Sequence, residues 1–181
     1  MHGWWAGSYV VLWLLVLVLC AVVVALARQI GALHLRLGPR GALEMDDEGP
    51  PLGQPLPTAS ADGADGRRIA IGISGSGRLL LFVSPGCSLC EQVLPGLEAV
   101  ARAGNMTAQV ISDSDPFETN KHFGSSALSG PQLMRAWDVP GTPYAVVLDR
   151  AGIVRAKGTP NNLEQLEGLV DSARRRAREA I

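Results

Sequence analysis

Two cysteines separated by two residues, Cys87 and Cys90, are the side chains of this sequence best suited to chemistry. They lie between an apolar run, residues 79–84 (LLLFVS), and a stretch with helical periodicity, residues 91–101. A C-x-x-C pair in that setting indicates a redox-active dithiol, because one helical turn brings the two sulfurs close enough to bond. Cys87, at the helix N-terminus, is favoured as a thiolate and is the expected nucleophile. Cys90, one turn further and more shielded, is expected to resolve the mixed disulfide.

Other uses of the cysteines fit the sequence less well. A zinc site needs four ligands, and the sequence has no second C-x-x-C or H-x-H pair. A c-type haem requires a histidine directly after the second cysteine, where Glu91 stands. A pair of buried structural cysteines stays open as an alternative. We therefore expect no metal and no cofactor beyond the pair itself, and we expect Cys20, in the apolar N-terminal run, to be inert.

A second candidate feature is the Thr142-Pro143 step before the apolar run of residues 144–148 (YAVVL). A peptide bond that precedes proline at such a tight entry to a strand can be cis. Because proline lacks an N–H group, the backbone of Thr142 would be open to a bound peptide. Taken alone, the step could equally be an ordinary loop proline. Together with the C-x-x-C motif upstream, it predicts a substrate groove formed by Thr142 and Pro143.

The elements that must position these residues alternate between strand and helix. Strands are expected at residues 69–73, 79–84, 108–111, 144–148 and 153–156, the first of them at a sheet edge. Helices are expected at residues 91–101, 115–124, 131–137 and 163–180. Pro95 should kink the first helix, and Asp115 with Pro116 should begin the second. This order predicts an α/β fold.

The N-terminal region has a different character. Residues 3–27 contain no Asp, Glu, Lys or Arg, and all of those residues lie from Arg28 onward. The apolar run of residues 8–27 would span roughly 30 Å as a helix, which matches a bilayer's hydrocarbon core. A cleaved signal peptide is the alternative, but it calls for a basic start and a shorter run. We therefore expect an uncleaved transmembrane helix.

The chain is expected to comprise five segments. Residues 1–7 are expected to be a short tail, residues 8–27 the transmembrane helix, and residues 28–48 a juxtamembrane segment that begins as an amphipathic helix. Residues 49–66 are rich in Pro, Gly and small side chains without apolar periodicity, which is typical of a flexible linker. Residues 67–181 form the folded domain. The net charge of −1 gives no indication of nucleic-acid binding.

Three stretches, LLLFVSPGCSLC, GTPYAVVLD and RAGIVRAKG, resemble the thioredoxin superfamily over residues 67–181. With the juxtamembrane stretch ARQIGALHLRLGPRGAL, the sequence further resembles the MauD family of methylamine utilisation proteins. The resemblance implies a thioredoxin-like fold, a central mixed sheet flanked by helices, with Pro143 in cis beside Cys87. Two departures stand out. Gly86 replaces the tryptophan that precedes the first cysteine in thioredoxins, and the strand of residues 79–84 lacks their buried acid.

The resemblance also implies a function. It indicates a membrane-anchored thiol–disulfide oxidoreductase or isomerase that helps to mature the disulfide-rich small subunit of methylamine dehydrogenase. A polytopic membrane protein resembling MauE is then the expected partner. A tethered chaperone or assembly factor without redox activity is the alternative. The direction of exchange depends on a reduction potential that the two residues between the cysteines do not fix.

The orientation in the membrane brings two indications into conflict. The family resemblance implies a single-pass protein of the inner (cytoplasmic) membrane with its catalytic domain in the periplasm, where disulfides persist. Arg28, Arg36 and Arg40 follow the apolar run, and no Lys or Arg precedes it. The positive-inside rule would therefore place the domain in the cytoplasm. Only Arg28 adjoins the run, so we follow the resemblance.

Overall fold

The N-terminal unit is a single helix. The computed structural model describes residues 3–36, 48–57, 59–71 and 75–179, and it divides into two compact units, Met1–Pro39 and Arg40–Ile181. The first unit contains α1 (Gly3–Arg36), which is long and apolar enough to cross a membrane by its length and composition. Its large apolar side chains from Tyr9 to Val24 are exposed, as expected of a surface that contacts lipid.

The helix α1 extends beyond the predicted transmembrane segment at both ends. It begins at Gly3, inside the predicted tail, and continues through the first part of the predicted juxtamembrane segment to Arg36. Gly38 and Pro39 are residue types that end helices, so the sequence predicts a stop there; both lie outside the described residues. The helix can continue past the apolar run because its backbone hydrogen bonds do not depend on the polarity of the side chains.

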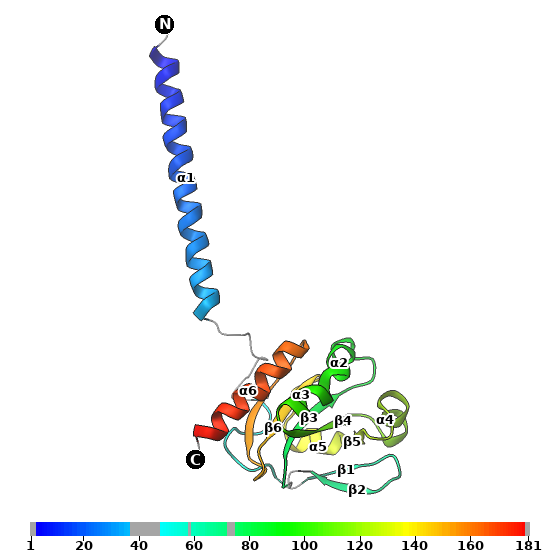
Figure 1. Ribbon diagram of the computed structural model, residues 1–181. Helices are drawn as coiled ribbons and strands as arrows, with labels where there is room; N and C mark the ends of the chain where they lie inside the picture. Colours follow the sequence, from blue (N-terminus) through cyan, green and yellow to red (C-terminus); the bar gives the residue numbers. More distant parts are fainter. Residues whose placement is uncertain (1–2, 37–47, 58, 72–74, 180–181) are drawn as a thin grey trace. The chain divides into compact units, whose positions relative to one another are not determined.

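The second unit is built on a seven-stranded mixed sheet with strand order β2-β1-β5-β4-β3-β6-β7 (Figure 1). The strands are β1 (Ala59–Asp62), β2 (Arg68–Ile71), β3 (Gly77–Val83), β4 (Met106–Ser112), β5 (Leu128–Ser129), β6 (Tyr144–Leu148) and β7 (Val154–Gly158). Central strand β3 runs parallel to β4 and antiparallel to β6. The helices are α2 (Ser88–Val93), the 3-10 turn η1 (Leu94–Gly96), α3 (Leu97–Ala103), α4 (Pro116–Phe123), α5 (Pro131–Ala136) and α6 (Leu163–Glu179). The predicted thioredoxin-like α/β fold is confirmed.

Strand β3 is covered on both faces, as its continuous apolar run predicts. On one face, Leu79, Leu81 and Val83 pack with apolar residues of α2, α3 and α6. On the other face, Leu80 and Phe82 pack with apolar residues of α5 and β6. All five of these side chains are fully buried. The interior of the domain is therefore organised around this strand.

Local signals in the sequence account for the helix boundaries. The Asp115 carboxylate accepts hydrogen bonds from the N–H groups of Phe117 (2.9 Å) and Glu118 (3.1 Å), so it caps α4 as predicted. The helix ends at Gly124, whose φ of +83° suits glycine. The predicted kink at Pro95 takes the form of the 3-10 turn η1, which separates α2 from α3.

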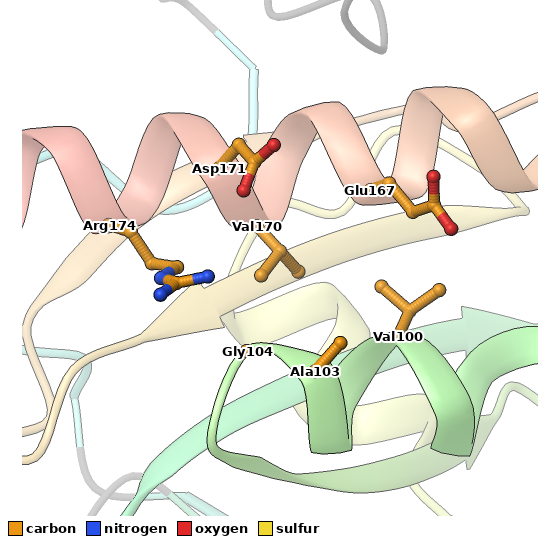
Figure 2. A pocket seen from close by; sticks show the side chains of 7 residues that line it. All are labelled: Val100, Ala103, Gly104, Glu167, Val170, Asp171 and Arg174. Atoms are coloured by element: carbon orange, nitrogen blue, oxygen red, sulfur yellow. The ribbon is translucent and has the colours of Figure 1, made fainter.

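A shallow cavity of about 190 Å³ lies between α3 and α6 (Figure 2). Its wall combines the apolar Val100 and Val170 with the charged Glu167, Asp171 and Arg174. None of the predicted site residues lines it. The cavity is therefore a surface depression where two helices meet, separate from the cysteine pair.

The structure corrects one prediction, the flexible linker over residues 49–66. This segment contains strand β1, which pairs antiparallel with β2, and Leu56 is buried. Before β1, backbone hydrogen bonds join the segment to β7: Gly53 N donates to Val154 O (2.8 Å), and Val154 N donates to Gln54 O (3.0 Å). The prediction was wrong because it rested on side-chain composition, whereas main-chain hydrogen bonds to the sheet hold this segment.

The segment is fastened to the domain at Glu48 and Gly49. The Glu48 carbonyl accepts hydrogen bonds from Tyr144 Oη (3.1 Å) and from Nζ of the buried Lys157 (2.7 Å). Gly49 N donates to the carbonyl of Asp138 (3.1 Å). Gly49 has φ +70°, and a Cβ atom there would clash with Tyr144 Oη. Only glycine allows this close approach of backbone and ring.

Because of this contact, we expect substitution by alanine to destabilise the protein more at Gly49 than at the nearby Gly53. Gly49→Ala should lower the free energy of unfolding by at least about 2 kcal/mol, since it adds a clash to an unfavourable φ. Gly53→Ala is the matched control, because Gly53 has φ +74° and no atom within 4 Å of its Cβ position. It should cost only about 1–2 kcal/mol. Pulse proteolysis of the full chain in detergent across a urea series measures both; equal losses would contradict the close approach.

The β6–β7 turn is organised by one carboxylate. Asp149 Oδ1 accepts from the N–H groups of Ala151 (2.8 Å) and Ile153 (3.0 Å), and Oδ2 accepts from Arg155 Nε (2.7 Å). Burial by itself raises the pKa of Asp149, but these hydrogen bonds and the Arg155 charge outweigh it, so the pKa is lowered. A lowered pKa in the folded state means that Asp149 stabilises the fold above its unfolded pKa, about 3.9.

We therefore expect Asp149→Asn to lower the free energy of unfolding by about 1–2 kcal/mol at pH 7. The difference from the parent chain should shrink as the pH falls below about 4, because the parent carboxylate then becomes protonated too. Asp171→Asn, at an exposed position on α6, is the control and should change the free energy of unfolding little at pH 7. Urea unfolding at pH 7 and at acidic pH provides the measurement. A pH-independent difference at position 149 would show that the ionised carboxylate is not what stabilises the turn.

Candidate active site

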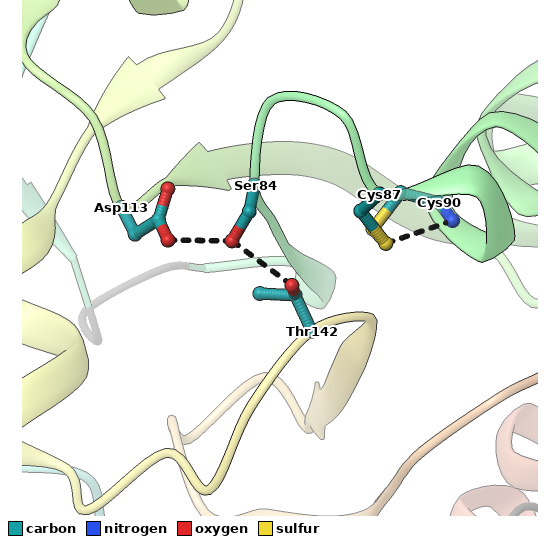
Figure 3. Close-up of a disulfide and its surroundings, with 5 residues drawn as sticks. All are labelled: Ser84, Cys87, Cys90, Asp113 and Thr142. Carbon is teal, nitrogen blue, oxygen red and sulfur yellow. Dashed lines mark hydrogen bonds between the residues drawn. A yellow bond between two sulfur atoms is a disulfide. The ribbon is translucent and has the colours of Figure 1, made fainter.

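The two cysteines form a disulfide at the start of α2 (Figure 3). Cys87 is the N-cap residue of the helix, its Sγ accepts a hydrogen bond from Cys90 N (3.1 Å), and the two Cα atoms are 5.2 Å apart. Cys87 is partly exposed, whereas Cys90 is fully buried. The pair is thus asymmetric, with one sulfur accessible to a partner and the other shielded.

A tight turn between β3 and α2 places Cys87 at the helix start. Cys87 N donates to the carbonyl of Ser84 (3.2 Å), which closes the turn directly after β3 ends. Gly86 within the turn has φ +76°. A bulky side chain would be strained at such a φ, so this turn favours glycine at position 86.

The Thr142-Pro143 step lies at the same end of the sheet. Its peptide bond is cis, as the family resemblance implied. Pro143 directly precedes β6. Because β3 and β6 are antiparallel and Phe82 pairs with Tyr144, Pro143 lies next to the end of β3. Thr142 Oγ1 donates to Ser84 Oγ (2.9 Å), and the Ser84 carbonyl accepts from Cys87 N (3.2 Å), so Ser84 links this step to the turn before Cys87. The structure therefore brings the four predicted site residues together.

Sequence reasoning missed two polar residues at this site, Ser84 and Asp113. Ser84 Oγ donates to Asp113 Oδ2 (2.5 Å) and accepts from Thr142 Oγ1 (2.9 Å), as Figure 3 shows. Ser84 directly follows β3, and Asp113 directly follows β4. These strands are parallel neighbours, so the residues after them meet at one edge of the sheet. A search of the strand ends for polar residues would have found both.

The remaining chemistry-bearing residues lie elsewhere. Cys20 is exposed on α1 and has no disulfide partner among the described residues. His122 Nε2 lies 3.2 Å from Glu118 Oε2 on α4. Within the described ranges no group of three or more His, Cys, Asp or Glu residues could hold a metal ion. Glu91, next to Cys90, is exposed.

A reversible disulfide is the chemistry that this arrangement supports. A partly exposed sulfur at a helix N-terminus can ionise and attack a disulfide, and a second sulfur one turn away can displace the product. The loop with the cis proline is linked to the same turn through Ser84. This is the arrangement of a thioredoxin-like thiol–disulfide oxidoreductase, and it uses the cysteine pair as its redox group.

Comparison with solved structures agrees with this fold. A thiol:disulfide interchange protein from Bacteroides sp. superimposes with a TM-score of 0.52 at 19% identity, covering 67% of this chain and 89% of its own. The thioredoxin domain of a thiol-disulfide oxidoreductase from Bacteroides vulgatus gives a TM-score of 0.50 at 19% identity, with 66% and 97% coverage. At these identities, the likeness establishes the thioredoxin-like fold.

Comparison of sequences is more specific. No protein-family model matches the chain. The methylamine utilization protein MauD of Paracoccus denitrificans is 34% identical over 177 residues, covering 93% of this chain and 88% of the relative. MauD of Methylorubrum extorquens is 33% identical over 175 residues, with 92% and 85% coverage. These matches extend well beyond the cysteine motif and include most of the N-terminal region. The chain therefore belongs to the MauD family of methylamine utilization proteins.

Proposed function

We propose that this protein exchanges thiols and disulfides on protein clients, with Cys87 as the nucleophile and Cys90 as the resolving thiol. The Cys87 thiolate attacks a client disulfide, bonds to one sulfur and releases the other as a thiolate. The Cys90 thiol then loses its proton, attacks Cys87 Sγ and releases the second client thiolate. Two electrons pass to the client as the Cys87–Cys90 disulfide forms. The same steps in reverse oxidise a client dithiol.

The unequal exposure of the two sulfurs is the observation that carries this proposal. Cys90 is fully buried, so a macromolecular disulfide can reach only the partly exposed Cys87. The hydrogen bond from Cys90 N to Cys87 Sγ favours negative charge on that sulfur. The first bond to a client therefore forms at Cys87, and the second step follows within one helical turn.

Thr142 and Pro143 supply the groove for the client in this proposal. Pro143 has no N–H group, and its cis bond turns the chain just before β6. The Thr142 backbone can then pair with an extended client segment that lies next to Cys87, in the way a strand adds to a sheet edge. Pro143 itself is buried, so the groove has a firm base.

The client and the cellular setting are a finer part of the proposal. The relatives are named for methylamine utilization, which supports the small subunit of methylamine dehydrogenase as client and a polytopic membrane protein resembling MauE as partner. Helix α1 would tether the domain to the inner membrane as a single span. A disulfide-forming site favours a periplasmic domain, although Arg28 and Arg36 at the end of α1 favour the opposite orientation.

The proposed order of steps predicts a trapped intermediate. Cys90→Ser should accumulate a mixed disulfide between Cys87 and its client, because the second displacement is blocked. In a methylamine-grown host, non-reducing electrophoresis and mass spectrometry would identify the linked client. The Cys87→Ser/Cys90→Ser variant is the matched control and should give no adduct. Normal growth on methylamine with the double variant would instead indicate a chaperone without redox activity.

The proposed orientation predicts selective labelling. On intact cells that have been reduced, a membrane-impermeant maleimide should modify Cys87 when the domain is periplasmic. A Cys87→Ser variant reports any background from other cysteines. If Cys87 becomes labelled only after the cells are lysed, the domain lies in the cytoplasm, and the periplasmic placement is wrong.

A further inference from the structure

A chain of hydrogen bonds connects three separate segments: the loop before β6, the residue after β3 and the residue after β4. Thr142 Oγ1 donates to Ser84 Oγ (2.9 Å), and Ser84 Oγ donates to Asp113 Oδ2 (2.5 Å), as Figure 3 shows. Each hydroxyl group has only one proton to donate. An ionised Asp113 can only accept, so it fixes the direction of both bonds. The loop before β6 is thereby tied to a carboxylate at the end of β4.

Asp113 is itself held firmly. Its N–H donates to the carbonyl of Val83 (3.2 Å), and its Oδ1 accepts from Ser114 Oγ (3.3 Å). The Ser114 carbonyl in turn accepts from two buried hydroxyl groups, Ser129 Oγ (2.5 Å) and Thr119 Oγ1 (3.2 Å). Asp113 itself is exposed, but the backbone of Ser114 beside it is anchored by buried hydroxyl groups, and the chain of bonds runs from this point to Thr142.

The loop before β6 contains a residue that packing does not hold in place. Gly141, directly before Thr142, is exposed, and no atom lies within 4 Å of its Cβ position. Packing therefore does not hold the loop at that residue. Hydrogen bonds that end on a charged group are stronger than hydrogen bonds between neutral groups. The link to Asp113 is well suited to hold Thr142 in place.

We propose that Asp113 and Ser84 are positioning residues for the client groove: they hold the Thr142-Pro143 loop where it can pair with a client segment next to Cys87. The inference rests on the proposed function. Neither residue transfers a proton or bonds to the client in this account. They act through Thr142, so their loss should weaken the capture of peptides and leave the sulfur chemistry intact.

A comparison of two substrates tests this role. Reduced full-length protein in detergent is mixed with a peptide disulfide, which needs the groove, or with a small aromatic disulfide, which does not. Ser84→Ala removes both hydrogen bonds and should lower kcat/KM for the peptide about tenfold, mainly through KM. Its rate with the small disulfide should stay within about twofold of the parent. Asp113→Asn keeps an acceptor but removes the charge, so it should fall between parent and Ser84→Ala.

Asp115→Ala provides the control for a general loss of stability. It removes the cap of α4, and so destabilises this helix, without touching the three linked residues. It should leave both substrates unaffected. Equal losses of Ser84→Ala with both substrates, no loss with either, or a peptide-specific loss in Asp115→Ala would each overturn the positioning role. A parent protein inert towards both disulfides would instead refute the proposed function, so the two failures are distinguishable.

Discussion

The burial of β3 on both faces is the constraint on which the site depends. Its side chains from Leu79 to Val83 are fully buried between two apolar clusters, and each contributes about 1.5–3 kcal/mol through the apolar surface it removes from water. Hydrogen bonds to β4 and β6 fix the register of the strand. Packing in the domain interior and strand pairing therefore fix the position at which β3 ends.

The positions of the site residues depend on where β3 ends. The chain leaves β3, turns through Gly86 and begins α2 at Cys87, so the first sulfur lies at the surface and the second within the core. The parallel neighbour β4 delivers Asp113 to the same edge, and the antiparallel neighbour β6 brings Pro143 there. One buried strand thus positions a reactive sulfur, a loop for a client and the carboxylate that holds this loop.

Much of this was predictable from local patterns. The apolar run of β3, the cap at Asp115 and the break at Pro95 are each encoded by a few adjacent residues, and the structure confirms all three. The C-x-x-C motif predicted the asymmetry of the two sulfurs for the same reason. The cis bond before Pro143 required the family resemblance, because a lone X-Pro step does not distinguish the two isomers.

The misses share a physical cause, since each depends on contacts between residues distant in the sequence. Residues 49–66 read as a linker by composition, yet backbone hydrogen bonds to β7 and the pairing of β1 with β2 incorporate them into the fold. The link between Ser84 and Asp113 arises only when two parallel strands end side by side. Neither the pairing of residues 49–66 with the sheet nor the Ser84–Asp113 link produces a periodic pattern in the sequence.

The central claim is that the two sulfurs differ in accessibility and role, and alkylation of the reduced full-length protein tests it most directly. The protein is treated briefly with iodoacetamide, and the modification of each cysteine is followed by mass spectrometry. The account predicts that Cys87 is alkylated many times faster than Cys90, because only its sulfur reaches the surface. Equal rates, or faster alkylation of Cys90, would contradict it.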